Sequence, residues 1–66
     1  MIKVIRLSGE VLYLNLFQVE YMESIPETKI QMMNGNYYLV KDTVDSIMKQ
    51  AAVFLNNCIN FEGRSK

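Results

Sequence analysis

Short stretches rich in hydrophobic and β-branched residues, bounded by turn-forming residues, recur over the first two thirds of the chain, a pattern typical of β-strands. Turn-forming residues separate these stretches: Ser8-Gly9 follows the first, and Asn34-Gly35 precedes the last. Asn15 is a plausible cap for a short helical turn over residues 16–18, and Pro26 ends the third stretch because proline cannot donate to a sheet. The stretches that predict strands are residues 2–7, 11–15, 19–24, 28–33 and 36–40.

The hydrophobic period changes after residue 42 to that of an amphipathic helix. Asp42 is expected to cap the start of this helix, and Asp45 lies near its positive end. Polar residues at 49, 50, 56 and 57 lie largely off the apolar stripe. The stripe itself consists of Val44, Ile47, Met48, Ala51, Phe54, Leu55 and Cys58.

These elements predict an α+β fold, a small antiparallel β-meander of about five short strands with one C-terminal amphipathic helix packed on one face. We expect one domain over residues 1–60 and a flexible tail over 61–66. Phe54→Ala should then cost about 3–5 kcal/mol, and Cys58 should be a buried, inert thiol. The residues expected to meet between sheet and helix are Ile30, Met32, Val44, Ile47, Ala51 and Phe54.

The second hairpin can adopt two registers, which differ in the face that its last strand presents. A two-residue turn pairs Met33 with Asn36 and places Ile30 and Met32 on the face of residues 37 and 39. A three-residue loop with Gly35 in the left-handed position pairs Met32 with Asn36 instead. Ile30 and Met32 then share a face with residues 38 and 40. The first register therefore points Tyr38 outward, and the second points Tyr37 outward.

Composition predicts a protein that assembles with other chains. The chain has 66 residues, of which 50% are hydrophobic. A domain of this size buries only about 60% of the surface of its unfolded chain. Cys58 is the only cysteine, so no disulfide can form within the chain. We therefore expect a homo-oligomer.

The residue chemistry argues against an enzyme. The sequence has no histidine, which excludes hydrolysis by a serine or cysteine activated by a histidine base. Its three glycines lie too far apart to form a phosphate-binding loop. Glu20 and Glu23 lie three apart in a predicted strand and should face opposite sides. We expect no catalytic residues, no cofactor and no metal site.

Charge and hydropathy limit the classes of partner and the cellular compartment that we expect. Seven basic and seven acidic side chains cancel, so no nucleic-acid partner is expected, although Tyr13, Tyr21, Tyr37 and Tyr38 could form a stacking platform for bases. No apolar run approaches the length of about 18 residues that a membrane span needs. The N-terminus does not resemble a signal peptide, and a free cysteine fits a reducing compartment. A cytoplasmic protein is expected.

Several short motifs in fixed order give the chain a resemblance to a known family. They are MIKVIRLSG at 1–9, LN at 14–15, VE at 19–20, PET at 26–28, NG at 34–35 and LVKD at 39–42. Together they resemble the small FlbD/SwrD family of bacterial flagellar proteins over residues 1–58. The chain departs from that pattern at Ile5, where threonine is common, at Lys29, where an aliphatic residue is common, and at Asp42, where glutamate is frequent. The resemblance implies a cytoplasmic motility protein without known catalytic residues.

The resemblance also favours the three-residue loop in the second hairpin, because similar sequences are rich in lysine at positions 36 and 37, as outward residues would be. The candidate interaction face is then Lys29, Gln31, Tyr37 and Leu39, on the side away from the helix. We expect this face to contact another subunit or a flagellar or motor-associated protein. The predicted function is non-enzymatic and acts through protein–protein interaction in flagellar assembly or motor output. The alternative is a small nucleic-acid-binding regulator that uses a tyrosine-bearing sheet face.

Overall fold

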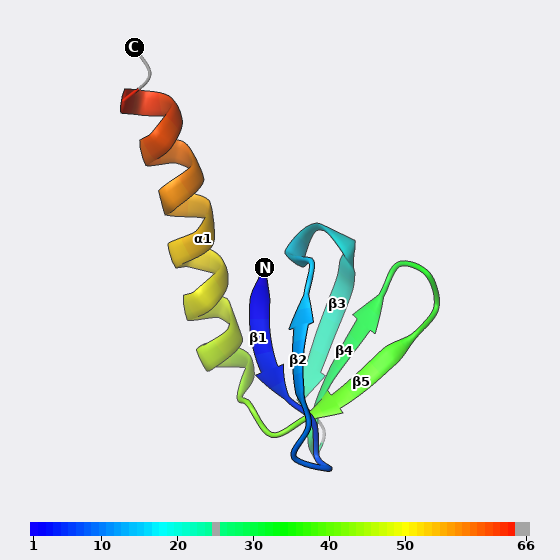
Figure 1. Cartoon of the computed structure of the whole chain (residues 1–66). Coiled ribbons are helices and arrows are strands. Elements are labelled where there is room, and N and C mark those ends of the chain that lie inside the picture. The colour runs from blue at the N-terminus through cyan, green and yellow to red at the C-terminus, as the bar shows by residue number, and fades with distance from the viewer. Residues whose placement is uncertain (25, 65–66) are drawn as a thin grey trace.

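The computed structural model describes residues 1–24 and 26–64, with side chains described up to residue 57 (Figure 1). It has five strands, a short 3-10 helix and one C-terminal α-helix, so the predicted α+β class is confirmed. The elements in chain order are β1 (Ile2–Ile5), β2 (Val11–Leu14), η1 (Leu16–Gln18), β3 (Val19–Ser24), β4 (Thr28–Met32), β5 (Tyr37–Val40) and α1 (Val44–Arg64).

The β4–β5 hairpin has the three-residue loop. The N–H of Met32 donates to the carbonyl of Asn36 at 2.8 Å, and the N–H of Gly35 donates back to the Met32 carbonyl at 3.1 Å. Gly35 has φ 95°, in the left-handed region that glycine adopts without strain. The loop between β1 and β2 is built in the same way, with Gly9 at φ 98°. The register favoured by the resemblance is therefore confirmed.

The five strands do not form one continuous meander. β1 and β2 make a two-stranded antiparallel sheet, and β3, β4 and β5 make a three-stranded one in that order. The sheets join where Arg6 bridges Val40 and the N–H of Lys41 donates to the Ile5 carbonyl at 2.7 Å. The chain order of the strands is thus broken at the step from β2 to β3.

The physical reason for this break is the short helix η1. The side chain of Asn15 accepts a hydrogen bond from the N–H of Phe17 at 3.0 Å, which starts a helical turn directly after β2. This cap was expected from the sequence. The turn reorients the chain, so β3 pairs with β4 and not with β2.

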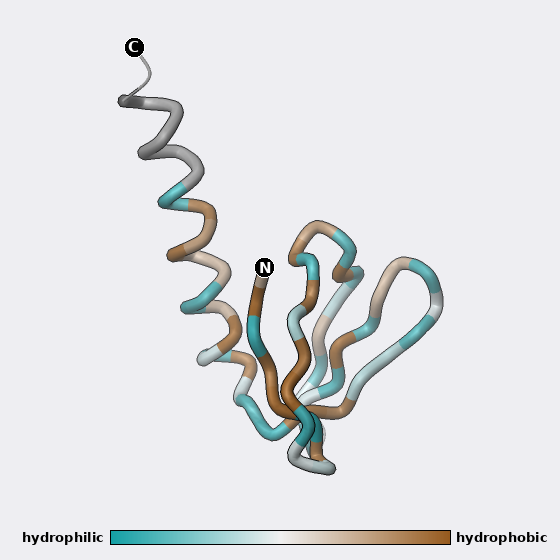
Figure 2. Tube along the Cα trace, viewed as in Figure 1, coloured by the Kyte–Doolittle hydropathy of each residue, from teal (hydrophilic) through white to brown (hydrophobic). Residues whose placement is uncertain are grey.

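The core takes residues from both sheets and from the helix. The expected core positions Ile30, Met32, Ile47 and Ala51 are buried. Val44 and Phe54 were wrongly assigned to the core, because both remain partly exposed. Three further core residues, Ile2, Val4 and Leu14 of β1 and β2, were not expected there. Val40 of β5 is also in the core, on the face that the three-residue loop gives it with Ile30 and Met32. Figure 2 shows the hydrophobic stretches of β1 and β2.

The start of α1 differs from the prediction. Thr43 caps the helix, since its Oγ1 accepts from the N–H of Ser46 at 3.1 Å. Asp42 is one residue too early for that role. Its Oδ1 instead accepts from the backbone N–H of Ile5 at 2.6 Å. The carboxylate thus ties the beginning of the helix to β1.

Helix α1 lies against β1, as Figure 1 shows, and one glutamine completes the contact. The Oε1 of Gln50 accepts from the N–H of Lys3 at 2.9 Å, and its Nε2 donates to the Lys3 carbonyl at 2.7 Å. The amide therefore bonds β1 as a neighbouring strand would. The sequence pattern had placed Gln50 off the packed face of the helix.

Several apolar side chains of α1 are exposed to solvent. Met48 and Leu55, which were expected on the packed stripe, are exposed, as is Val53. The helix continues to Arg64, so the tail predicted over 61–66 begins inside it, and the flexibility of that segment stays a prediction. The side chain of Cys58 lies outside the described residues.

Gln50→Ala is expected to lower the free energy of unfolding by about 1–2 kcal/mol, because the backbone groups of Lys3 lose both partners. Alanine is a better helix former than glutamine, so helix propensity cannot cause this loss. Urea unfolding measures it. The neighbouring Lys49→Ala, on an exposed position, is the control and should change stability by less than about 0.5 kcal/mol. Equal stability of the two variants would show that the glutamine contact is unimportant.

Ile47→Ala should be more damaging than Phe54→Ala, although phenylalanine is the larger side chain. Ile47 is fully buried in the core cluster, so its truncation should cost about 2–5 kcal/mol. Phe54 is partly exposed, with its ring edge-on to Phe17 at 5.9 Å between centroids, and should cost about 1–2 kcal/mol. Thermal melting of both variants decides the order. The reverse order would return Phe54 to the core.

Candidate functional site

The structure brings the four residues of the candidate interaction face together. Lys29 lies directly opposite Leu39, and Gln31 lies opposite Tyr37, in the β4–β5 ladder. Directly opposed residues of an antiparallel pair share one face. The alternate residues of these strands face the core with Ile47 of the helix. The four side chains therefore lie on the side of the sheet away from the helix.

Two of these side chains are apolar and in contact with solvent. Tyr37 is 57% exposed and Leu39 is 38% exposed. Val40, one residue further along β5, is only 1% exposed. Strand β5 is apolar on both faces, but only one of these faces fills the core. The outward side chains contribute little to the core.

Polar side chains of β4 lie beside the outward Tyr37. The Nζ of Lys29 lies 4.7 Å from the centroid of the Tyr37 ring, which is within cation–π distance. The Nε2 of Gln31 donates to the carbonyl of Asn36 at 3.2 Å. Both Lys29 and Gln31 are half-buried. The arrangement presents an aromatic ring backed by a cation.

Sequence reasoning missed two further members of this surface. Tyr21 of β3 lies opposite Gln31, and Leu7 donates its N–H to the carbonyl of Leu39 at 3.2 Å. Tyr21 is 44% exposed and Leu7 is 43% exposed. Their apolar side chains within the predicted strands 2–7 and 19–24 were a signal in the sequence, but only the observed strand register assigns both residues to this side. We call the combined surface the outer sheet face: Leu7, Tyr21, Lys29, Gln31, Tyr37 and Leu39.

A shallow hollow of about 350 Å³ adjoins the outer sheet face where β5 meets the β1–β2 loop. Arg6 lies at its edge, with its Cζ 5.9 Å from the centroid of the Tyr38 ring. Its Nη1 also forms an ion pair with Oε1 of Glu10 at 3.0 Å. The hollow thus combines apolar walls with a guanidinium group. Its lining is Arg6, Leu7, Ser8, Tyr37, Tyr38 and Leu39.

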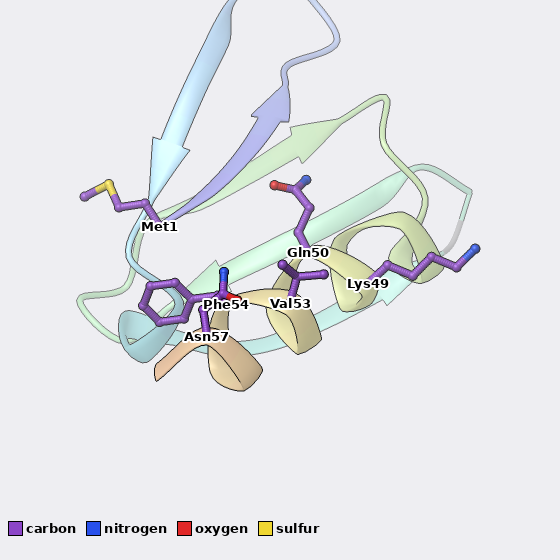
Figure 3. Close-up of a pocket in the computed structure, with 6 residues that line it drawn as sticks. All are labelled: Met1, Lys49, Gln50, Val53, Phe54 and Asn57. Carbon is purple, nitrogen blue, oxygen red and sulfur yellow. The ribbon is translucent and has the colours of Figure 1, made fainter. Parts of the chain in front are cut away.

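A second hollow of about 460 Å³ lies between Met1 and α1 (Figure 3). Among the described residues that line it, Lys49 has the only ionisable side chain, so these residues offer no acid–base pair of side chains for catalysis. The amide of Gln50 is already engaged by Lys3. The lining consists of Met1, Lys49, Gln50, Val53, Phe54 and Asn57, all drawn in Figure 3.

Over the residues whose positions the structure gives, no three side chains of histidine, cysteine, aspartate or glutamate gather in a group that could hold a metal ion. Within the same residues, no helix has the length and hydrophobicity needed to cross a membrane.

Comparison with known proteins places the chain in a family. The model of the FlbD family, described as flagellar and swarming motility proteins, matches residues 1–59. No curated protein and no solved structure gives a significant match. The matched residues include all five strands, the two hairpin loops that contain glycine and the packed part of α1. The chain therefore belongs to the FlbD family of flagellar and swarming motility proteins.

Proposed function

We propose that this protein acts in flagellar motility as a non-enzymatic, cytoplasmic interaction module whose outer sheet face binds a flagellar or motor-associated protein. The observation that carries the proposal is the exposure of Tyr37 and Leu39 on a face that the core does not use. Family membership supplies the motility role. The mechanism and the location are our inference.

The chemistry of the outer sheet face suits a protein partner. Tyrosine and arginine are over-represented among the residues that dominate binding energy at interfaces. Here Tyr37 and Tyr21 provide rigid aromatic surface, and Lys29, which lies opposite Glu23 of β3, provides a cation. A partner with an apolar anchor would complement this surface. The shallow hollow beside Leu39 could receive the anchor.

The absence of histidine from the sequence supports a non-enzymatic role. Among the described residues that line the two hollows, no nucleophile lies beside a general base, which acyl transfer requires. Ser8 lines the smaller hollow, but the other lining residues there are arginine, leucines and tyrosines. Binding therefore fits the residues better than catalysis does.

A nucleic-acid-binding regulator is the second candidate. Lys29 over Tyr37 and Arg6 over Tyr38 place cations on aromatic rings, an arrangement that also suits stacked bases. Two features count against it: Glu10 pairs with Arg6, and the whole chain carries no net charge. Phosphate binding requires a basic excess.

We also propose that the protein is a homo-oligomer. Its apolar residues exceed what the small core buries, and many of them lie on strands at the surface. Ile5, Val11 and Tyr13 of the β1–β2 sheet are exposed in addition to the outer sheet face. Association between copies would remove part of this surface from water.

The double change Tyr37→Lys, Leu39→Lys tests the outer sheet face. We expect a folded protein, because both side chains point away from the core, and a loss of swimming or swarming when it replaces the native copy in motile cells. Circular dichroism and thermal melting check the fold, and spreading in soft agar checks motility. Full motility with a folded variant would leave the face without this role.

Two matched variants control this experiment. Ser46→Lys, Asn56→Lys adds the same charge at exposed positions of α1 and should leave motility intact. Tyr38→Lys, Val40→Lys places the same lysines on the inward face of β5 and should abolish folding, since Val40 is buried. Comparison of these variants distinguishes the loss of a surface contact from the loss of the folded core.

Salt dependence distinguishes the two candidate functions. Binding of a single-stranded RNA or DNA probe through phosphates weakens by about 10³–10⁵ between 50 and 200 mM salt when 6–10 phosphates are contacted. We expect no such binding at micromolar protein, as measured by fluorescence anisotropy. A steep salt slope at that concentration would favour the nucleic-acid reading.

A further inference from the structure

The lateral edges of the strands are protected unequally. The N–H and C=O groups of an edge strand can pair with another chain, and proteins usually block them with covering segments, charges or bulges. The free edge of β1 is covered, because Gln50 bonds Lys3 and Asp42 bonds Ile5. The edge of β5 is joined to the end of β1 through the Arg6–Val40 bridge.

The outer edge of β3 is blocked by different means. A register shift between Val19 and Tyr21 marks a bulge in its ladder with β4. The strand also contains Glu20 and Glu23, and both are exposed. A bulge and two carboxylates are features that discourage pairing with a further strand.

The outer edge of β2 has none of these protections within the described residues. The strand reads Val-Leu-Tyr-Leu, without charge, proline or bulge. Among the described residues, β2 pairs with β1 alone, and no side chain forms a hydrogen bond with its backbone. Of the described strands, β2 has an outer edge that is open along its whole length.

The register identifies the backbone groups at this edge. Arg6 donates its N–H to the Glu10 carbonyl, so that pair is hydrogen-bonded, and bonded pairs alternate along an antiparallel ladder. The bonded pairs further along are therefore those of Leu12 and Leu14. The N–H and C=O groups of Val11 and Tyr13 consequently point away from β1. Two donors and two acceptors face outward at regular spacing.

We propose that β2 of a second copy of this chain pairs antiparallel with β2 along this edge. With the two-fold axis at Leu12, Val11 lies opposite Tyr13 of the partner subunit, and Tyr13 opposite Val11 of the partner subunit. Each of these pairs exchanges both backbone hydrogen bonds. The two hairpins then form one sheet in the order β1, β2, partner β2, partner β1.

The side chains of β2 suit self-pairing. In this register a β-branched residue faces an aromatic one on the outer side, a favourable cross-strand pair, and Leu12 meets its own copy on the other side. No like charges are opposed within the strand. Pairing β3 with itself would instead bring carboxylates toward carboxylates. The interface leaves Tyr37 and Leu39 free, so it does not depend on the role proposed for the outer sheet face.

Tyr13→Pro tests the pairing, with Tyr13→Thr as the matched control. Proline removes the outward N–H of residue 13 and breaks no bond within the hairpin, whereas threonine keeps the N–H and a strand-forming side chain. At about 50 µM, sedimentation equilibrium should give dimer mass for the native protein and the threonine variant, and monomer mass for the proline variant. The variant with lysine at 37 and 39 should remain a dimer.

Amide hydrogen exchange gives a second readout that needs no variant. In the native protein at high concentration, the N–H groups of Val11 and Tyr13 should exchange at least about tenfold more slowly than in a dilute sample. A native protein of monomer mass, a proline variant that remains dimeric, or exchange at these two amides as fast as in the loops would overturn the proposal. A monomer that binds a strand of another protein at β2 would overturn it as well.

Discussion

The pairing between the Gln50 amide and the backbone of Lys3 is the contact on which the rest of the molecule depends. A two-stranded hairpin is at best marginally stable alone, because half of its backbone groups have no strand partner. Gln50 satisfies one such residue of β1 from the helix, and Asp42 satisfies another two positions along. The helix thereby serves β1 both as a packing layer and as a hydrogen-bonding neighbour.

This contact determines how the two sheets share one core. With its outer edge covered by α1, β1 places Ile2 and Val4 against Ile47, and the Arg6–Val40 bridge brings β5 into the same cluster. The inward side chains of both sheets are then enough to bury Ile47 completely. The outward side chains have no such role. In our proposal, these outward side chains are the ones that contact partners.

The division between inward and outward residues also separates two surfaces with different chemistry. The outer sheet face offers aromatic and aliphatic side chains beside Lys29, and we propose that it recognises side chains of a partner. The edge of β2 offers backbone groups, which pair with an extended strand whatever its sequence. The two proposed contacts use different parts of the chain, so they would not compete.

The sequence by itself determined the elements: the short apolar stretches of the strands, the helical period after residue 42, the cap at Asn15 and the two loop glycines agree with the structure, because these features depend on neighbouring residues. The resemblance selected the register that puts Tyr37 outward. Only the tertiary structure decided that Gln50 and Asp42 bond β1, that Phe54 stays partly exposed, and that Leu7 and Tyr21 join the outer sheet face. These features depend on contacts between segments far apart in the chain, and hydrophobic periodicity carries no information about which polar side chain will meet an unpaired backbone group.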